Sequence, residues 1–193
     1  PELTFDSADW VRDTDGWSFE NGVLKANPGY EAEANTYALH YAHALPEHYE
    51  MNFTVVRPEI PGVQRELVFT FAENGSYKSV RLLWDNSGVV LYDSDGTAHW
   101  IAGSYNSEWY AASESTEFAF KITVRKGIFS FTPPPGGMES RSIALSSLAW
   151  QSGSNAAGIR LHVRNDSDME MKNISVSEIV VLPELSFTVR TGC

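Results

Sequence analysis

The chain has 193 residues, of which 42% are hydrophobic and 12% aromatic, so we expect one large domain with a substantial core. Its formal net charge of −11 argues against a nucleic-acid partner, because phosphate recognition needs a basic surface. The single cysteine, Cys193, excludes an internal disulfide, so packing of the core must hold the fold together.

The first part of the chain predicts a lead-in followed by a β-hairpin. Residues 1–15 carry four aspartates around a tryptophan, and we expect them to form a surface lead-in. In residues 17–26, Asn21-Gly22 separates two short strand-like runs and supplies the positive φ angles that a tight turn requires. We therefore predict two antiparallel strands joined at this dipeptide.

Most of the remaining chain predicts further strands. Residues 49–56, 65–72, 77–84 and 118–125 each alternate in the way expected of a strand with one buried face. We count about a dozen such strands, separated by turn signals, and no long helix. This pattern predicts an all-β fold, a two-sheet sandwich or a barrel, in a single domain of residues 1–193. We expect residues 183–193 to pack along one edge as a tail.

Residues 102–115 form the longest irregular stretch, and it is rich in aromatic side chains. Long loops that carry aromatic residues are frequent sites of ligand binding. Tyr105 and Trp109 of this stretch, together with Trp100 just before it, are candidate platforms for a sugar ring, and packing inside the sandwich is the alternative for each.

Residues 157–165 alternate without a break, so their apolar and basic side chains lie on opposite sides of one strand. Arg160, His162 and Arg164 share one side, at steps of roughly 7 Å. Positive charges at this spacing repel one another, so a carboxylate on a neighbouring strand or a ligand should offset them. Two interpretations remain open: a solvated outer face with acidic partners, or a binding face for a polar, acidic ligand.

Taken in chain order, several segments resemble the concanavalin A-like lectin/glucanase jelly rolls. The likeness is to the laminin-G-like group in particular, which contains domains described as sugar hydrolases. The segments are 17–24 (Trp-x-Phe-x-Asn-Gly-x-Leu), 49–55, 120–131, 158–161 and 172–179. The resemblance covers nearly the whole chain and is a pattern of strands, with no catalytic signature. It implies two antiparallel sheets that bend together, with a saccharide groove on the inner, concave sheet.

Our first hypothesis is carbohydrate recognition, with a poly- or oligosaccharide as the partner on the concave face. Such a groove needs aromatic platforms and a few polar side chains that hydrogen-bond to the sugar. The aromatic candidates are those named above. The polar candidates are Arg81, Glu66, Arg160, His162 and Arg164.

The second hypothesis is an enzyme on the same face, and the sequence leaves open whether the domain is catalytic. A polysaccharide lyase needs a cation beside the uronate and a histidine or tyrosine that takes the proton. Jelly-roll alginate lyases carry Gln-x-His on one strand, and Arg160-x-His162 has this spacing with arginine in place of glutamine. Arg81 and Tyr77 would complete the set.

A glycoside hydrolase fits less well, because hydrolysis needs two carboxylates about 5–9 Å apart and the Glu-x-Asp-x-x-Glu run of laminarinase-like relatives is absent. The third hypothesis is a structural or adhesion domain without a sugar ligand.

We expect no cofactor and assign no metal ligands. A structural calcium ion would be ordinary for this superfold, and the acidic turns 93–96 and 166–168 are its candidate sites. Glycosylation sequons at Asn52, Asn74, Asn165 and Asn173 add weak support for a secreted or periplasmic domain. No apolar run approaches the roughly 18 residues of a membrane-spanning helix, so we expect no membrane insertion.

Overall fold

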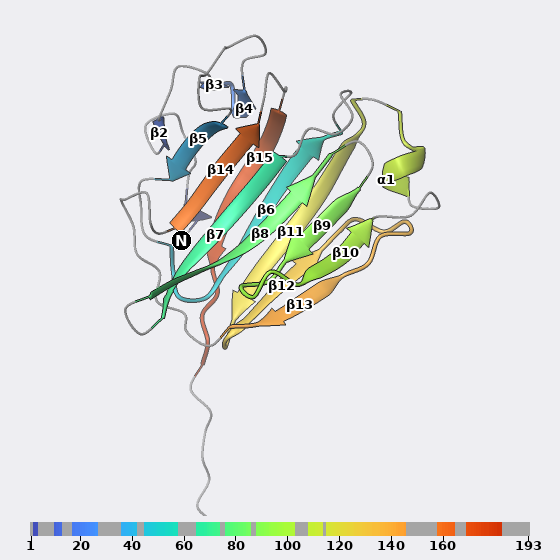
Figure 1. Cartoon of the computed structure of the whole chain (residues 1–193). Helices are drawn as coiled ribbons and strands as arrows, with labels where there is room; N and C mark the ends of the chain where they lie inside the picture. The colour runs from blue at the N-terminus through green and yellow to red at the C-terminus, as the bar shows by residue number, and fades with distance from the viewer. Residues whose placement is uncertain are drawn as a thin grey trace, which may run out of the picture.

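The computed structural model describes residues 2–3, 10–12, 17–26, 36–41, 45–57, 65–73, 76–85, 88–102, 108–113, 115–145, 158–164 and 169–182. These residues form two antiparallel sheets stacked as two layers (Figure 1). The all-β sandwich predicted from the alternating segments is confirmed.

One sheet has eight strands and the other has seven. The eight-stranded sheet runs in the order β13 (Arg141–Ala144), β12 (Ile128–Thr132), β11 (Glu117–Arg125), β6 (Tyr49–Val56), β15 (Met169–Glu178), β4 (Val23–Ala26) and β3 (Trp17–Glu20), with β1 (Glu2–Leu3) paired to β15. The seven-stranded sheet runs in the order β10 (Ala98–Ala102), β9 (Val89–Tyr92), β8 (Ser76–Trp84), β7 (Arg65–Glu73), β14 (Gly158–Arg164), β5 (Thr36–Tyr41) and β2 (Trp10–Arg12).

The core lies between the two sheets and is built from the apolar side chains of the alternating strands. Phe69 of β7 meets Phe129 of β12 with ring centroids 5.1 Å apart, which joins the two layers directly. Phe120 packs against Phe53 at 5.9 Å and against Phe131 at 5.2 Å. Since aromatic pairs at these separations add to simple area burial, this layer stabilises both sheets at once.

The predicted hairpin at residues 17–26 is confirmed as β3 and β4. Asn21 and Gly22 have φ angles of 53° and 76°, the left-handed values that a two-residue turn between twisted strands requires. Lys126 and Gly127, with φ angles of 48° and 76°, make the corresponding turn between β11 and β12. Local turn chemistry therefore sets the register of both hairpins.

Two details differ from the sequence expectations, and one strand pairing is irregular. The lead-in contributes two short strands, β1 and β2. The irregular stretch contains one short helix, α1 (Glu108–Ala111). The pairing of β15 with β6 shifts between Lys172 and Ser175, where Asn173 has a φ angle of 54°, so a β-bulge interrupts this strand. Residues 183–193 lie outside the described part.

No helix among the described residues is long and apolar enough to cross a membrane.

Candidate functional site

The seven-stranded sheet carries two rows of residues on the face turned away from the core. Leu67, Leu82 and Leu91 belong to the core, so the residues that alternate with them face outward. The pairing registers define the two rows across the sheet. The arginine row is Tyr92, Arg81, Val68, Arg160 and His40, and the glutamate row is Trp100, Val90, Leu83, Glu66, His162 and Ala38.

Arg81 and Glu66 form an ion pair at the middle of this face. The Arg81 Nη1 atom lies 3.6 Å from Glu66 Oε1, and the guanidinium carbon lies 5.0 Å from the centroid of the Tyr92 ring. Glu66 is only 4% exposed, whereas the Arg81 side chain remains 38% exposed. The guanidinium is therefore held in place between a carboxylate and an aromatic ring and still meets solvent.

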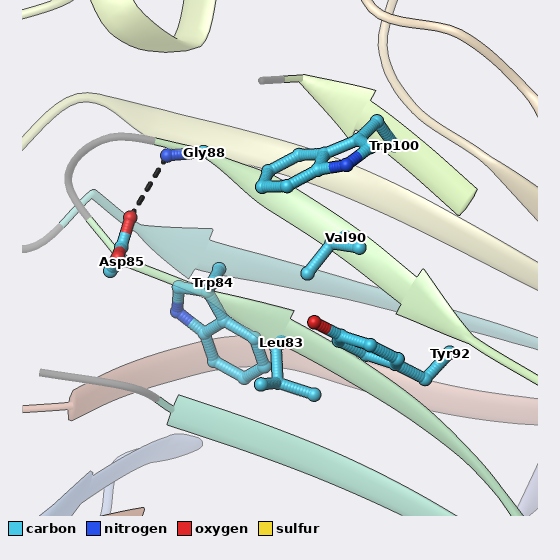
Figure 2. Close-up of a pocket in the computed structure, with 7 residues that line it drawn as sticks. All are labelled: Leu83, Trp84, Asp85, Gly88, Val90, Tyr92 and Trp100. Atoms are coloured by element: carbon cyan, nitrogen blue, oxygen red, sulfur yellow. Dashed lines mark hydrogen bonds between the residues drawn. The ribbon is translucent and has the colours of Figure 1, made fainter. Parts of the chain in front are cut away.

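A pocket of about 80 Å³ lies on the same face, at the end nearest β10. Figure 2 shows Trp100, Val90, Leu83 and Tyr92 gathered around it. At its far end the Gly88 backbone N–H donates to Asp85 Oδ1 at 2.9 Å, which closes the turn between β8 and β9. Trp100 is 54% exposed, so its indole is available as a wall for a ligand.

The register brings four of the five predicted polar residues to the centre of the sheet. His162 lies directly across from Glu66, and Arg160 lies in the same row as Arg81, with Val68 between them. Arg164 lies two positions beyond His162, across from Thr36. The backbone thus places the basic positions of β14 beside the Arg81–Glu66 pair.

Tyr77 is not brought to this cluster. His162 shares its row with Leu83 of β8, and Tyr77 lies six residues from Leu83, which is roughly 20 Å along a strand. The four candidate catalytic residues therefore do not meet at one point. Tyr105 lies outside the described residues.

The prediction that Trp109 is a ligand platform is wrong. Helix α1 turns this side chain inward, where it is fully buried and packs against Phe118 at 4.8 Å. Its indole N–H donates to the backbone carbonyl of Asp85 at 2.8 Å. The expected loop aromatic is therefore part of the core, and Tyr92, which sequence reasoning did not single out, takes its place at the pocket.

In the acidic turn at residues 93–96, the Asp93 carboxylate makes hydrogen bonds within the protein. Asp93 Oδ1 accepts hydrogen bonds from the backbone N–H groups of Asp95 at 3.0 Å and Thr97 at 2.9 Å, and Oδ2 lies 3.0 Å from His99 Nε2. The hydrogen bond with His99 lowers the pKa of Asp93 below its ordinary value. Both carboxylate oxygens thus already have partners. The described residues include no cluster of three or more His, Cys, Asp or Glu suited to a metal ion, and residues 166–168 lie outside the described part.

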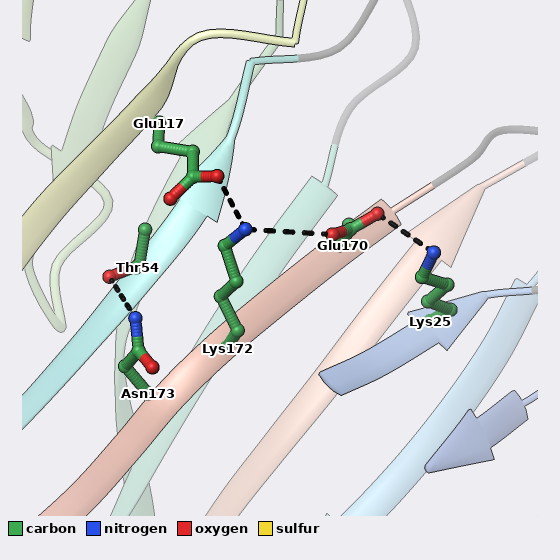
Figure 3. A network of polar contacts seen from close by, with 6 residues as sticks. All are labelled: Lys25, Thr54, Glu117, Glu170, Lys172 and Asn173. Atoms are coloured by element: carbon green, nitrogen blue, oxygen red, sulfur yellow. Dashed lines mark hydrogen bonds and ion pairs between the residues drawn. The ribbon is translucent and has the colours of Figure 1, made fainter. Parts of the chain in front are cut away.

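The outer face of the eight-stranded sheet is organised differently (Figure 3). Lys172 bonds to Glu117 and lies 4.0 Å from Glu170, which also pairs with Lys25 at 3.1 Å. A wider hollow of about 370 Å³ lies on this sheet. Its lining includes Asn52, Thr54, Lys121 and Asn173, and its two aromatic residues, Phe53 and Phe120, belong to the buried core.

Comparison with known proteins supports the fold. No protein-family model and no curated protein sequence matches the chain. The solved structures that it resembles include the exoplasmic/lumenal domain of VIP36 in its Ca²⁺/Man3GlcNAc-bound form, with a TM-score of 0.63 and 8% identity over 95% of this chain and 91% of that one.

Two enzymes are also similar in structure. A prokaryotic β-1,3-1,4-glucanase (lichenase) derived from a mouse hindgut metagenome gives a TM-score of 0.58 at 8% identity, over 92% of this chain and 96% of that one. A variant of the family 7 alginate lyase A1-II′ in complex with product gives 0.53 at 14% identity, over 86% and 84%. The chain has the concanavalin A-like jelly-roll fold, as its strand pattern predicted. At these identities the likeness establishes the fold alone.

Proposed function

We propose that the protein is an extracytoplasmic carbohydrate-recognition domain that binds a poly- or oligosaccharide on the outer face of its seven-stranded sheet. In this proposal the face is the concave side of the jelly roll. The glutamate and arginine rows supply the polar contacts, and the pocket beside Trp100 supplies the apolar surface.

One observation carries this proposal: an exposed tryptophan and a charged pair held in place lie on one face, next to a pocket. Trp100 is 54% exposed while Arg81 and Glu66 pair beside Tyr92. Sugar sites combine apolar surface for the ring faces with a few fixed polar groups for the hydroxyls. The similarity to VIP36, a glucanase and an alginate lyase agrees with a saccharide ligand.

A glycan array followed by titration calorimetry tests the proposal. Binding of at least one glycan class is expected, and Trp100→Ala should weaken it by tenfold or more, about the effect of removing a central aromatic contact. Ile128→Ala is the matched control, because Ile128 is also half-exposed, at 47%, but lies on the other sheet. An array without any binder, or equal affinities for wild type and Trp100→Ala, contradicts the proposal.

A polysaccharide lyase is the second candidate, favoured by the position of His162 across from Glu66 and beside the arginine row. In this candidate, His162 would take the proton and the arginines would neutralise a uronate. Incubation with uronate polymers, followed by absorbance at about 235 nm for the unsaturated product, separates a lyase from a binding module. His162→Ala should abolish any such signal, and no absorbance change with the wild type removes this candidate.

A glycoside hydrolase is not proposed, because the two central rows supply a single carboxylate, Glu66, where hydrolysis needs two.

A further inference from the structure

We propose that Arg81 and the adjoining pocket form a subsite for a sugar ring that bears a carboxylate, so that the domain selects acidic saccharides. This inference rests on the proposed function and adds the chemical class of the ligand. It is carried by the unused hydrogen-bonding capacity of Arg81, its partial exposure beside Tyr92 and the walls of the pocket.

Among the described residues, the Arg81 guanidinium contacts only one carboxylate and one aromatic ring, so several of its N–H donors remain available. A guanidinium carries five N–H donors in a planar fork. In the described structure Arg81 contacts Glu66 at 3.6 Å, too long for a normal hydrogen bond, and stacks near Tyr92. The ring of Tyr92 and the carboxylate of Glu66 fix the orientation of the fork without occupying it. A carboxylate arriving from solvent can therefore accept two parallel N–H bonds.

The register places further basic positions in the row of Arg81. The arginine row holds Arg81, Arg160 and His40, and the glutamate row holds Glu66 and His162. Two carboxylates also lie near the subsite, Glu66 beside Arg81 and Asp85 in the lining of the pocket. Selection of an anionic ring would therefore depend on Arg81 itself, whose guanidinium is partly exposed.

The pocket and the guanidinium share one side chain, that of Tyr92. Tyr92 stacks near Arg81 and also lines the pocket, together with Leu83, Val90 and Trp100. A volume of about 80 Å³ accommodates one edge of a sugar ring rather than an oligosaccharide. A ring whose apolar face rests on Trp100 would thus present a ring carboxylate to Arg81, whereas a neutral ring would gain the apolar contact alone.

Paired probes test this inference. Oligogalacturonate, alginate oligosaccharides and hyaluronan oligosaccharides would each be titrated in native and carboxyl-reduced form, which share rings and linkages and differ in charge. At least one native probe should bind tenfold or more tighter than its reduced form, as expected for a charge-assisted hydrogen bond. The difference should shrink as salt is added, because the guanidinium is partly exposed.

Arg81→Met should bring the native probe down to the affinity of the reduced one. Lys121→Met is the matched control, since Lys121 also pairs with a glutamate at 3.6 Å but lies on the other sheet. Arg81→Lys is a second variant, which keeps the charge and loses the fork; an intermediate affinity is expected.

The outcomes separate the two proposals. Equal binding of native and reduced probes, or a native preference that survives Arg81→Met, overturns the acidic subsite while saccharide recognition stands. If the array shows binding of neutral glycans alone, the acidic subsite is likewise overturned and saccharide recognition stands. Failure of every glycan to bind overturns the proposed function itself.

Discussion

The outer faces of the two sheets carry charged residues at similar spacing but differ in what surrounds those charges. On the eight-stranded sheet, Lys121 and Glu50 are 44% and 38% exposed and meet at 3.6 Å. On the seven-stranded sheet, Arg81 meets Glu66 at the same distance, but Glu66 is almost fully buried and Tyr92 lies beside the cation. The two ion pairs thus have the same separation, but Lys121–Glu50 is solvated whereas Arg81–Glu66 is held in place by its surroundings.

This difference shows that aromatic neighbours and burial, more than the presence of charge, distinguish a candidate binding face from an ordinary solvated one. Exposed pairs such as Lys121–Glu50 contribute little, because water screens them and both side chains lose freedom. A buried carboxylate and an aromatic ring that both contact one guanidinium hold it in one orientation, and such preorganisation favours recognition. The following predictions test the comparison.

The largest effect is expected from the tryptophans. Trp109→Ala should lower the free energy of unfolding by about 3–5 kcal/mol, because it removes a fully buried indole from the core beneath the pocket. Trp100→Ala should cost less than about 1 kcal/mol, because much of that side chain already meets water. Urea unfolding of both variants measures the two values. Similar losses would mean that Trp100 is structural too and weaken its assignment to a binding surface.

The second test compares the two glutamates. Glu66→Gln should destabilise the fold by about 1–3 kcal/mol, the usual range for a lost hydrogen bond or ion contact to a buried charged group. Glu50→Gln, on the solvated face, should cost less than about 1 kcal/mol. Thermal unfolding at neutral pH distinguishes them. If Glu50→Gln proved as costly as Glu66→Gln, the proposed distinction between the faces would fail.

Sequence alternation predicted the strands and which side chains share a side, but it did not predict their neighbours. The core face of β7, with Leu67 and Phe69, follows directly from the period of two. The contact of Arg81 with Tyr92 depends on how β8 pairs with β9, and the position of His162 across from Glu66 depends on a pairing between segments far apart in the chain. Alternation within one strand shows which residues share a side, but it does not identify which strands pair with one another.

Trp109 shows a second limit of the sequence. Its stretch has no strand or helix periodicity, so the sequence left both packing in the sandwich and exposure to a ligand open. In the structure, a single helical turn places the Trp109 side chain in the core. Its indole N–H donates a hydrogen bond to the carbonyl of Asp85, which lies on another segment of the chain. Contacts of this kind between irregular segments follow from tertiary packing alone.

The hairpin that carries Tyr92 and Trp100 should have an acid-sensitive turn. Hydrogen bonding to His99 lowers the pKa of folded Asp93, so its contribution to stability is complete above the unfolded value of about 3.9 and is lost as the pH falls through the folded pKa. Asp93→Asn should therefore lower the melting temperature at neutral pH and flatten its decline below about pH 4. Melting curves across the acidic range measure this. An unchanged slope would assign the acid response to other carboxylates.

The smallest effect is expected on the solvated face, at Lys172. Its hydrogen bond to Glu117 raises the pKa of the folded ammonium, so its contribution is complete below the unfolded value of about 10.4 and is lost as the pH rises through the folded pKa. Lys172→Met should remove this alkaline dependence and lower stability at neutral pH only slightly, because ion pairs of partly exposed side chains contribute little. Saccharide affinity should be unchanged, since Lys172 lies on the eight-stranded sheet, across the core from Arg81. A loss of binding in this variant would move the recognition surface to the wider hollow on that sheet and reverse the roles assigned to the two faces.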